Sequence, residues 1–225
     1  MEGFSDYQAT WGDKAREKMV KEQIIARGIS DKAVIAAMRK VPRHLFVPGE
    51  YMPDSYDDSP LPIGYGQTIS QPYIVALMTE TVKPGKGKRI LEIGTGSGYQ
   101  AAILAEICDT VYTIEIVPEL ADQSAALFKK TGYSNIISKY GDGYQGWPEY
   151  APFDIIVVTA APREIPRPLI DQLADNGRMV IPVGPPSAVQ ELILVEKTHD
   201  VIVQSRISFV RFVPFKRLPA GNQAP

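Results

Sequence analysis

The sequence predicts a doubly wound α/β fold with a mostly parallel sheet, an N-terminal helical extension and a C-terminal antiparallel hairpin. Two observations lead to this prediction. From residue 89 onward, short apolar strands alternate with single helices, which is the pattern of right-handed crossovers in a parallel sheet. In addition, the segment Asp154–Thr159 is a continuous apolar run, as expected for a strand that is covered on both faces.

Size and composition limit the classes of protein to consider. With 225 residues, of which 44% are hydrophobic, the chain is too short for two full α/β domains, so we expect a single domain over residues 1–225. Its net charge of -2 leaves no excess of basic residues for nucleic acid or an anionic membrane. One cysteine and two histidines provide neither an intrachain disulfide nor a metal-ligand cluster. We therefore expect a cytoplasmic protein without a metal, nucleic-acid or membrane partner.

Residues 10–84 are expected to form the helical extension and a long loop. A capping box at Thr10 predicts the start of a first helix, and Ser30 is the expected cap of a second. Prolines and glycines between residues 48 and 71 predict a loop-rich segment. Pro72 suits the first turn of a third helix, whose apolar face leads up to the core.

The remaining elements form the core, which we place at residues 85–217. Apolar patterning predicts strands at 89–93, 111–115, 135–140, 154–159 and 178–183, and helices at 99–105, 119–130 and 168–174. The last two apolar segments, 191–196 and 201–208, flank a polar turn and therefore predict an antiparallel hairpin.

The first core strand leads into a glycine-rich turn, with Gly94, Gly96 and Gly98 before a helix. Glycines allow the backbone to approach a ligand closely, and the helix start offers free N–H groups. Dinucleotide-binding turns have the spacing G-x-G-x-x-G, whereas the position after Gly98 is Tyr99, so a pyrophosphate site is disfavoured. A tight connection between strand and helix would also use glycines here.

Two carboxylates follow at the ends of the next strands. Glu115 ends the second core strand, where doubly wound folds place an acid that accepts hydrogen bonds from both hydroxyls of a ribose. Asp142 follows Gly141 after the third strand, where its side chain could accept from an adenine amino group. Each has a simpler interpretation, a solvated charge for Glu115 and a turn for Asp142. Together with the glycines they indicate a nucleoside-binding crevice at the carboxyl edge of the sheet.

These segments resemble known motifs. The turn Glu92–Gly98, Glu115, the Gly141-Asp142 step and Thr159-Ala160-Ala161-Pro162 are similar to the S-adenosylmethionine-binding motifs of class I methyltransferases, which have a Rossmann-like sheet. Within that class, Gly66-Gln67-Thr68-Ile69-Ser70-Gln71-Pro72 resembles the hallmark segment of the protein-L-isoaspartate O-methyltransferases. Segments 41–48 and 211–215 support this resemblance, which extends from about residue 18 to residue 215.

The resemblance implies an activity and a set of site residues. The activity is methyl transfer from S-adenosylmethionine to the α-carboxylate of L-isoaspartyl residues in damaged proteins and peptides, which yields S-adenosylhomocysteine and serves protein repair. Ser70 matches the active-site serine that contacts this carboxylate, and Phe212 and Val213 match the segment along the substrate backbone. The implied donor-binding residues are Gln67, Thr68, Ile69, Glu92, Gly94, Gly96, Gly98, Glu115, Ile116, Gly141, Asp142 and Thr159.

The residues themselves leave alternatives open. A methyltransferase for a small molecule, a dinucleotide-dependent oxidoreductase and a protein that only binds adenosylmethionine are the rival functions. Ser70 could serve simply as the cap of the helix that begins near Pro72. No Ser-His-Asp arrangement is evident, and His44 is expected to be structural rather than a general base. The order of the last strands in the sheet does not follow from sequence spacing.

Overall fold

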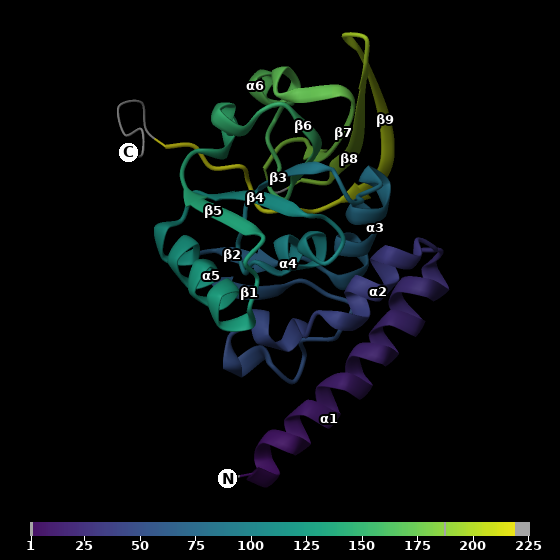
Figure 1. Ribbon diagram of the computed structural model, residues 1–225, viewed down its shortest axis with the longest axis vertical. Coiled ribbons are helices and arrows are strands. Elements are labelled where there is room, and N and C mark those ends of the chain that lie inside the picture. The colour runs from purple at the N-terminus through teal and green to yellow at the C-terminus, as the bar shows by residue number, and fades with distance from the viewer. Residues whose placement is uncertain (1, 187, 219–225) are drawn as a thin grey trace.

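The computed structural model describes residues 2–186 and 188–218, with the backbone alone for residues 2–10. Its centre is a seven-stranded sheet in the order β5-β4-β3-β6-β7-β8-β9 (Figure 1). The strands are β3 (Arg89–Ile93), β4 (Thr110–Glu115), β5 (Ile136–Tyr140), β6 (Phe153–Val158), β7 (Leu173–Val183), β8 (Gln190–Thr198) and β9 (Val201–Val210). The five strands from β5 to β7 pair in parallel, and β8 and β9 add an antiparallel hairpin. The predicted fold class is confirmed, and the order of the last strands is now defined.

Helices cover the two faces of this sheet. One buried cluster joins the sheet to α3 (Pro72–Val82), α4 (Tyr99–Ala105) and α5 (Pro118–Thr131). The opposite face packs against α6 (Arg167–Asp171) and the short helix η6 (Pro148–Tyr150), and Gly143 of the short helix η5 (Gly143–Gln145) lies against Ile93 of β3. Apolar packing on both faces explains why the central strand β6 is a nearly continuous apolar run rather than an alternating one.

The junction between α6 and β7 differs from the expectation. The predicted helix at 168–174 ends at Asp171, and the strand expected from residue 178 begins at Leu173. Leu173 is buried and pairs with Phe153, after which the register shifts until Arg178 pairs with Ile155. An irregularity of this kind interrupts the apolar periodicity, so the beginning of the strand was not visible in the sequence.

The N-terminal extension begins with a longer helix than predicted. α1 covers Glu2–Met19, so the predicted start at Thr10 is wrong and the expected capping box lies inside the helix. The helix continues through the π-helical η1 (Val20–Ile24) and the 3-10 helix η2 (Ile25–Arg27). It ends at Gly28, whose φ of 96° suits glycine.

The second helix, α2 (Lys32–Lys40), is capped by Asp31 rather than by Ser30. The Asp31 carboxylate accepts hydrogen bonds from the N–H groups of Ala33 and Val34 at 2.8 and 3.0 Å. Ser30 and Asp31 instead donate their backbone N–H groups to Glu80 of α3, both at 2.7 Å. The start of α2 is therefore joined to α3 by hydrogen bonds between residues 49 and 50 positions apart in the sequence. No local cap signal reveals such a contact.

The segment between α2 and α3 contains more regular structure than its prolines and glycines predict. It holds the short helices η3 (Arg43–Phe46) and η4 (Gly49–Tyr51), and a hairpin of β1 (Leu61–Gly64) with β2 (Gln67–Ile69). The hairpin turn at Tyr65 has a positive φ, flanked by two glycines that adopt the same region. This hairpin leads directly into α3.

Across the described residues, the structure contains no helix with the length and apolarity that a membrane crossing requires.

Candidate active site

The glycine-rich turn between β3 and α4 is packed tightly against the end of β6. Gly94 has a φ of 95°, and a Cβ atom there would lie 2.5 Å from the Thr159 hydroxyl oxygen. That hydroxyl donates to the carbonyl oxygens of Gly94 at 2.7 Å and Ile93 at 3.0 Å. Glycine is therefore required at position 94 by both conformation and space. Thr159, expected at the donor site, holds the turn in place.

Gly98 is required for a different reason. A Cβ atom on Gly98 would lie 2.6 Å from the ring of Phe128 in α5, and Gly98 lies at the N-cap of α4 with a φ of 86°. Gly98 therefore allows two helices to pack closely, and it lines neither of the two cavities described below. The sequence prediction that Gly98 flanks a ligand stays a prediction.

Glu115 is buried, so the alternative of a solvated charge at a strand end is wrong. Its Oε1 accepts hydrogen bonds from the N–H groups of Ile116 and Val117, both at 2.9 Å. Its Oε2 accepts from the N–H of Gly96 at 2.7 Å. A carboxylate offers about four acceptor positions, so one remains for a ribose hydroxyl, and a second hydroxyl would take the place of the Gly96 N–H. The acceptor expected for a ribose is thus coupled directly to the glycine turn.

Glu92 lies beneath the turn rather than in a cavity. It is fully buried, and one carboxylate oxygen accepts a hydrogen bond from the Thr113 hydroxyl. The Thr113 hydroxyl is also 2.6 Å from that of Thr95, which belongs to the turn. Burial raises the pKa of Glu92 to about 8, and the nearby Glu115 adds to this, so the carboxyl group is mostly protonated at neutral pH. Glu92 therefore supports the turn from below as a neutral acid.

Asp142 and the C-terminal segment meet at the next strand end. The Asp142 Oδ1 accepts from the N–H of Tyr144 at 3.0 Å and so caps η5. Its Oδ2 accepts from the Arg217 Nε at 2.8 Å, and the guanidinium of Arg217 lies 3.6 Å from the centre of the Tyr144 ring. The Asp142 Oδ2 also accepts from the N–H of Leu218 at 3.4 Å, so the turn role of Asp142 is present and one of about four acceptor positions remains for a ligand. Arg217 was missed by the sequence analysis because no local pattern joins residues 142 and 217.

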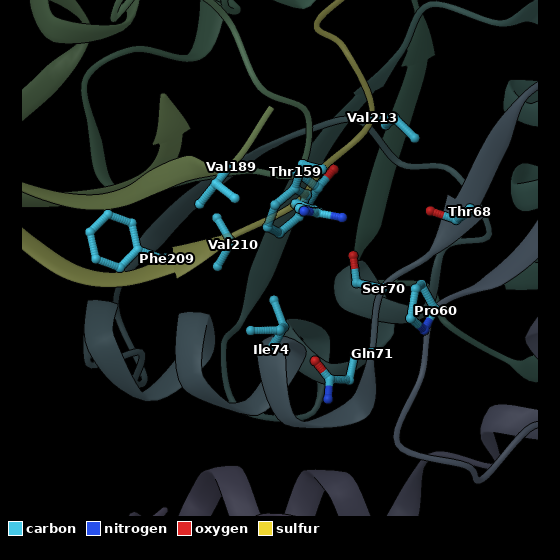
Figure 2. Close-up of a pocket in the computed structure, with 12 residues that line it drawn as sticks. Pro60, Thr68, Ser70, Gln71, Ile74, Thr159, Val189, Phe209, Val210 and Val213 are labelled. Carbon is cyan, nitrogen blue, oxygen red and sulfur yellow. The ribbon is translucent and has the colours of Figure 1, made fainter. Parts of the chain in front are cut away.

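Two of the cavities beside the glycine turn adjoin each other at Thr68, Ser70 and Thr159. The smaller, about 30 Å³, is lined by Gly94, Gly96 and Ile69 among others. The larger, about 390 Å³, opens between the start of α3 and the segment that follows β9. Both cavities are lined by Thr68, Ser70 and Thr159, so three hydroxyl-bearing residues stand at their common border. Figure 2 shows the larger cavity with the Ser70 hydroxyl directed into it.

Ser70 is not the cap of α3. The N-cap is Gln71, whose own side chain accepts no hydrogen bond from the first turn of that helix. Within the described part of the chain, no hydrogen bond occupies the Ser70 hydroxyl, which is therefore available to a ligand. Gln67, the first residue of β2, donates its side-chain N–H to the Tyr65 carbonyl at 3.2 Å and lines neither cavity.

The C-terminal segment forms the other wall of the larger cavity. Phe212 and Val213 both line it, as their expected contact with a substrate requires. The segment is fixed to the end of β6, because the Ala161 N–H donates to the Val213 carbonyl at 2.9 Å and the Phe215 N–H donates to the Ala161 carbonyl at 3.0 Å. The fold thus brings Phe212 and Val213 into the same cavity as Ser70, although about 140 residues separate them in the sequence.

The groups that could act as a general base lie elsewhere. His44 packs against Trp11, its Nδ1 is 2.7 Å from the Tyr56 hydroxyl, and burial lowers its pKa. Burial raises the pKa of the Cys108 thiol to about 11. Among the described residues that line the two cavities, Arg211 is the only charged side chain, and burial raises the pKa of Tyr99 above its usual value. The site therefore suits an acceptor that needs no deprotonation.

Comparison with known proteins agrees with this geometry. The family model for protein-L-isoaspartate(D-aspartate) O-methyltransferase matches residues 14–218. A protein-L-isoaspartate O-methyltransferase of Opitutus terrae is 57% identical over 202 residues, which cover 90% of this chain and 87% of the relative. The enzyme of that name from Gloeobacter violaceus is 55% identical over 199 residues, covering 88% of this chain and 97% of the relative.

Solved structures give the same result. A structure of a protein-L-isoaspartate O-methyltransferase superposes with a TM-score of 0.81 at 31% identity, covering 92% of this chain and 67% of that one. A Plasmodium falciparum protein described as a putative member, in complex with S-adenosyl-L-homocysteine, has a TM-score of 0.77 at 28% identity and covers 90% and 99% of the two chains. The chain belongs to the protein-L-isoaspartate(D-aspartate) O-methyltransferase family.

Proposed function

We propose that this chain transfers the methyl group of S-adenosylmethionine to the α-carboxylate of L-isoaspartyl residues in proteins and peptides. One observation carries the proposal. The small cavity at the glycine turn and the larger cavity at the C-terminal segment share Thr68, Ser70 and Thr159 at their border. The methyl end of a donor in the first, whose volume of about 30 Å³ admits little more, and a carboxylate in the second would meet at these hydroxyl groups.

The residues beside the small cavity fit an adenosylmethionine donor. Glu115 would accept from the ribose hydroxyls and Asp142 from the adenine amino group, with Ile116 and Gly141 beside them. The backbone at Gly94 and Gly96, which lines the small cavity, would lie along the methionine part together with Thr68 and Ile69. When bound, the donor supplies an electrophilic methyl group on a positively charged sulfur.

The acceptor would bind in the larger cavity. The Ser70 hydroxyl would donate a hydrogen bond to the acceptor carboxylate and orient one of its oxygens toward the small cavity. Phe212 and Val213 would lie along the substrate backbone on the opposite wall. Holding the reacting atoms in line and excluding water would supply most of the acceleration, because an anion and a cation are neutralised in the transition state.

No general base is needed for this reaction. A carboxylate with an ordinary pKa of about 4 is already ionised at neutral pH. The lining of the two cavities agrees, since among its described residues only Arg211 carries a charge. Methylation would convert the isoaspartyl carboxylate into an ester that can close to a succinimide, so the biological role would be repair of damaged proteins. Cytoplasmic location is part of the proposal, and cell fractionation tests it.

The experiment that tests this function is transfer of a labelled methyl group from S-adenosylmethionine to a synthetic isoaspartyl peptide. The same peptide with a normal aspartyl residue is the matched control, and a panel of small carboxylic acids tests the rival acceptor class. We expect label on the isoaspartyl peptide alone. Labelling of small acids with no labelling of either peptide would overturn the proposal.

A further inference from the structure

The larger cavity changes in character along its length. Hydroxyl groups surround its border with the small cavity, whereas Ile74, Val189 and Phe209 line its other end. In Figure 2, Val189 and Phe209 lie on the side of the cavity opposite Thr68, with Ile74 below them. Apart from the three hydroxyl-bearing residues, Gln71 and Arg211, the residues that line the cavity are apolar.

Two of these apolar side chains are open to solvent. Val189 is 50% exposed and Phe209 is 60% exposed. Isolated apolar residues on a surface are ordinary, but these two stand together at the mouth of a cavity. Val189 immediately precedes β8, and Phe209 is one residue from the end of β9. Phe209 lies in the edge strand β9, and Val189 lies in the loop that leads into β8.

The Phe209 ring is supported without being covered. Phe209 pairs with Glu191 across the β8–β9 hairpin. The Arg206 guanidinium lies 4.7 Å from the centre of the Phe209 ring and donates a hydrogen bond to Glu191 at 2.8 Å. A cation–π contact of this kind fixes the ring orientation and thereby limits the rotamer freedom that a ligand would have to remove.

We propose that Val189 and Phe209 form a subsite for an apolar side chain of the acceptor peptide. The proposal rests on the function proposed above and specifies its substrate. The subsite is continuous with the cavity in which Ser70 would bind the carboxylate, so the side chain belongs to a residue near the isoaspartyl residue. An extended chain advances about 3.3–3.6 Å per residue, so the peptide test covers the two positions on either side of the isoaspartyl residue.

A set of isoaspartyl peptides tests the subsite. Each peptide carries leucine or serine at one of the four positions nearest the isoaspartyl residue, and kcat/KM is measured for the parent, Phe209→Ser and Val189→Ser. We expect leucine to raise kcat/KM about tenfold over serine at one position in the parent, as an apolar anchor does. In both variants that ratio should fall to near one.

Val203→Ser is the matched control, because Val203 is 52% exposed on the same edge strand but does not line the cavity. Val203→Ser should keep the parental ratio of kcat/KM for leucine and serine peptides. All three variants should have the melting temperature of the parent. Equal kcat/KM for leucine and serine peptides in the parent, or a ratio that survives both subsite variants, would overturn the inference. If the parent were a dimer and Phe209→Ser a monomer, Val189 and Phe209 would belong to a self-association surface instead. Absence of methyl transfer to every peptide would refute the proposed function itself.

Discussion

Replacing Glu115 by glutamine should lower both the stability of the protein and its affinity for the donor. The carboxylate accepts three backbone N–H groups, those of Gly96, Ile116 and Val117. Glutamine keeps one carbonyl oxygen but places an NH2 group where the other oxygen was, so at least one backbone N–H faces a donor. A buried N–H without an acceptor costs about 1–3 kcal/mol. For a chain of this length, each kcal/mol corresponds to a fall of about 2–4 °C in melting temperature.

The effect on the donor follows from the same change. Hydrogen bonds from ribose hydroxyls to a charged acceptor contribute about 1.5–3 kcal/mol each, so losing one should weaken S-adenosylhomocysteine binding roughly ten- to hundredfold. Calorimetric titration and thermal melting measure the two effects. Asp122→Asn, on the exposed side of α5, is the control and should change neither. Unchanged affinity in Glu115→Gln would show that the ribose lies elsewhere, and unchanged melting would refute the hydrogen-bond argument.

Three further predictions concern other residues of the site. Ser70→Ala should lower kcat for an isoaspartyl peptide while leaving measurable turnover and nearly unchanged donor affinity. The reason is that one positioning hydrogen bond is lost rather than a nucleophile. A variant with the kcat and KM of the parent would show that Ser70 does not contact the acceptor. Arg217→Ala should change the dissociation rate of S-adenosylhomocysteine in stopped-flow experiments, since its ion pair with Asp142 occupies the proposed adenine end; an unaltered rate would make the pair purely structural. The pKa of Glu92 is raised by burial to about 8, so its contribution to stability is complete below pH ~4.5 and is lost as pH rises to about 8, by about 1.4 kcal/mol per pH unit. Urea unfolding from pH 5 to 8 should therefore show Glu92→Gln gaining stability relative to the parent, and parallel curves would contradict the raised pKa.

Local patterning predicted the central elements well. The strand at 89–93 and the helix at 99–105 have the predicted bounds, because apolar periodicity and the glycine turn both act over a few residues. The need for glycine at this turn was also predicted, but the physical reason differs from one glycine to the next. Gly94 is needed beside Thr159, whereas Gly98 is needed beside Phe128 in α5. A glycine in a sequence signals a lack of space without showing what occupies it.

Contacts between distant segments could not be predicted in the same way. The Arg217–Asp142 pair, the Gly96–Glu115 hydrogen bond and the contact of Glu80 with the start of α2 depend on the folded arrangement, since no periodicity links their residues. The order of β7, β8 and β9 likewise follows from sheet packing. For the acceptor side, only the family resemblance brought Ser70 together with Phe212 and Val213 before the structure did.

The claim that the acceptor is a carboxylate ionised before it binds is tested most directly by the pH dependence of kcat/KM for an isoaspartyl peptide. The profile should rise as the peptide carboxylate ionises near pH ~4 and then stay flat through neutrality, because neither reacting group titrates there. Folding at each pH is monitored by circular dichroism, and hydrolysis of the product ester is corrected for. His44→Gln should show the same plateau, since His44 contacts Tyr56 and lines neither cavity. A steep rise between about pH 6 and 8 that disappears in His44→Gln would contradict the account and would require an acceptor that loses a proton.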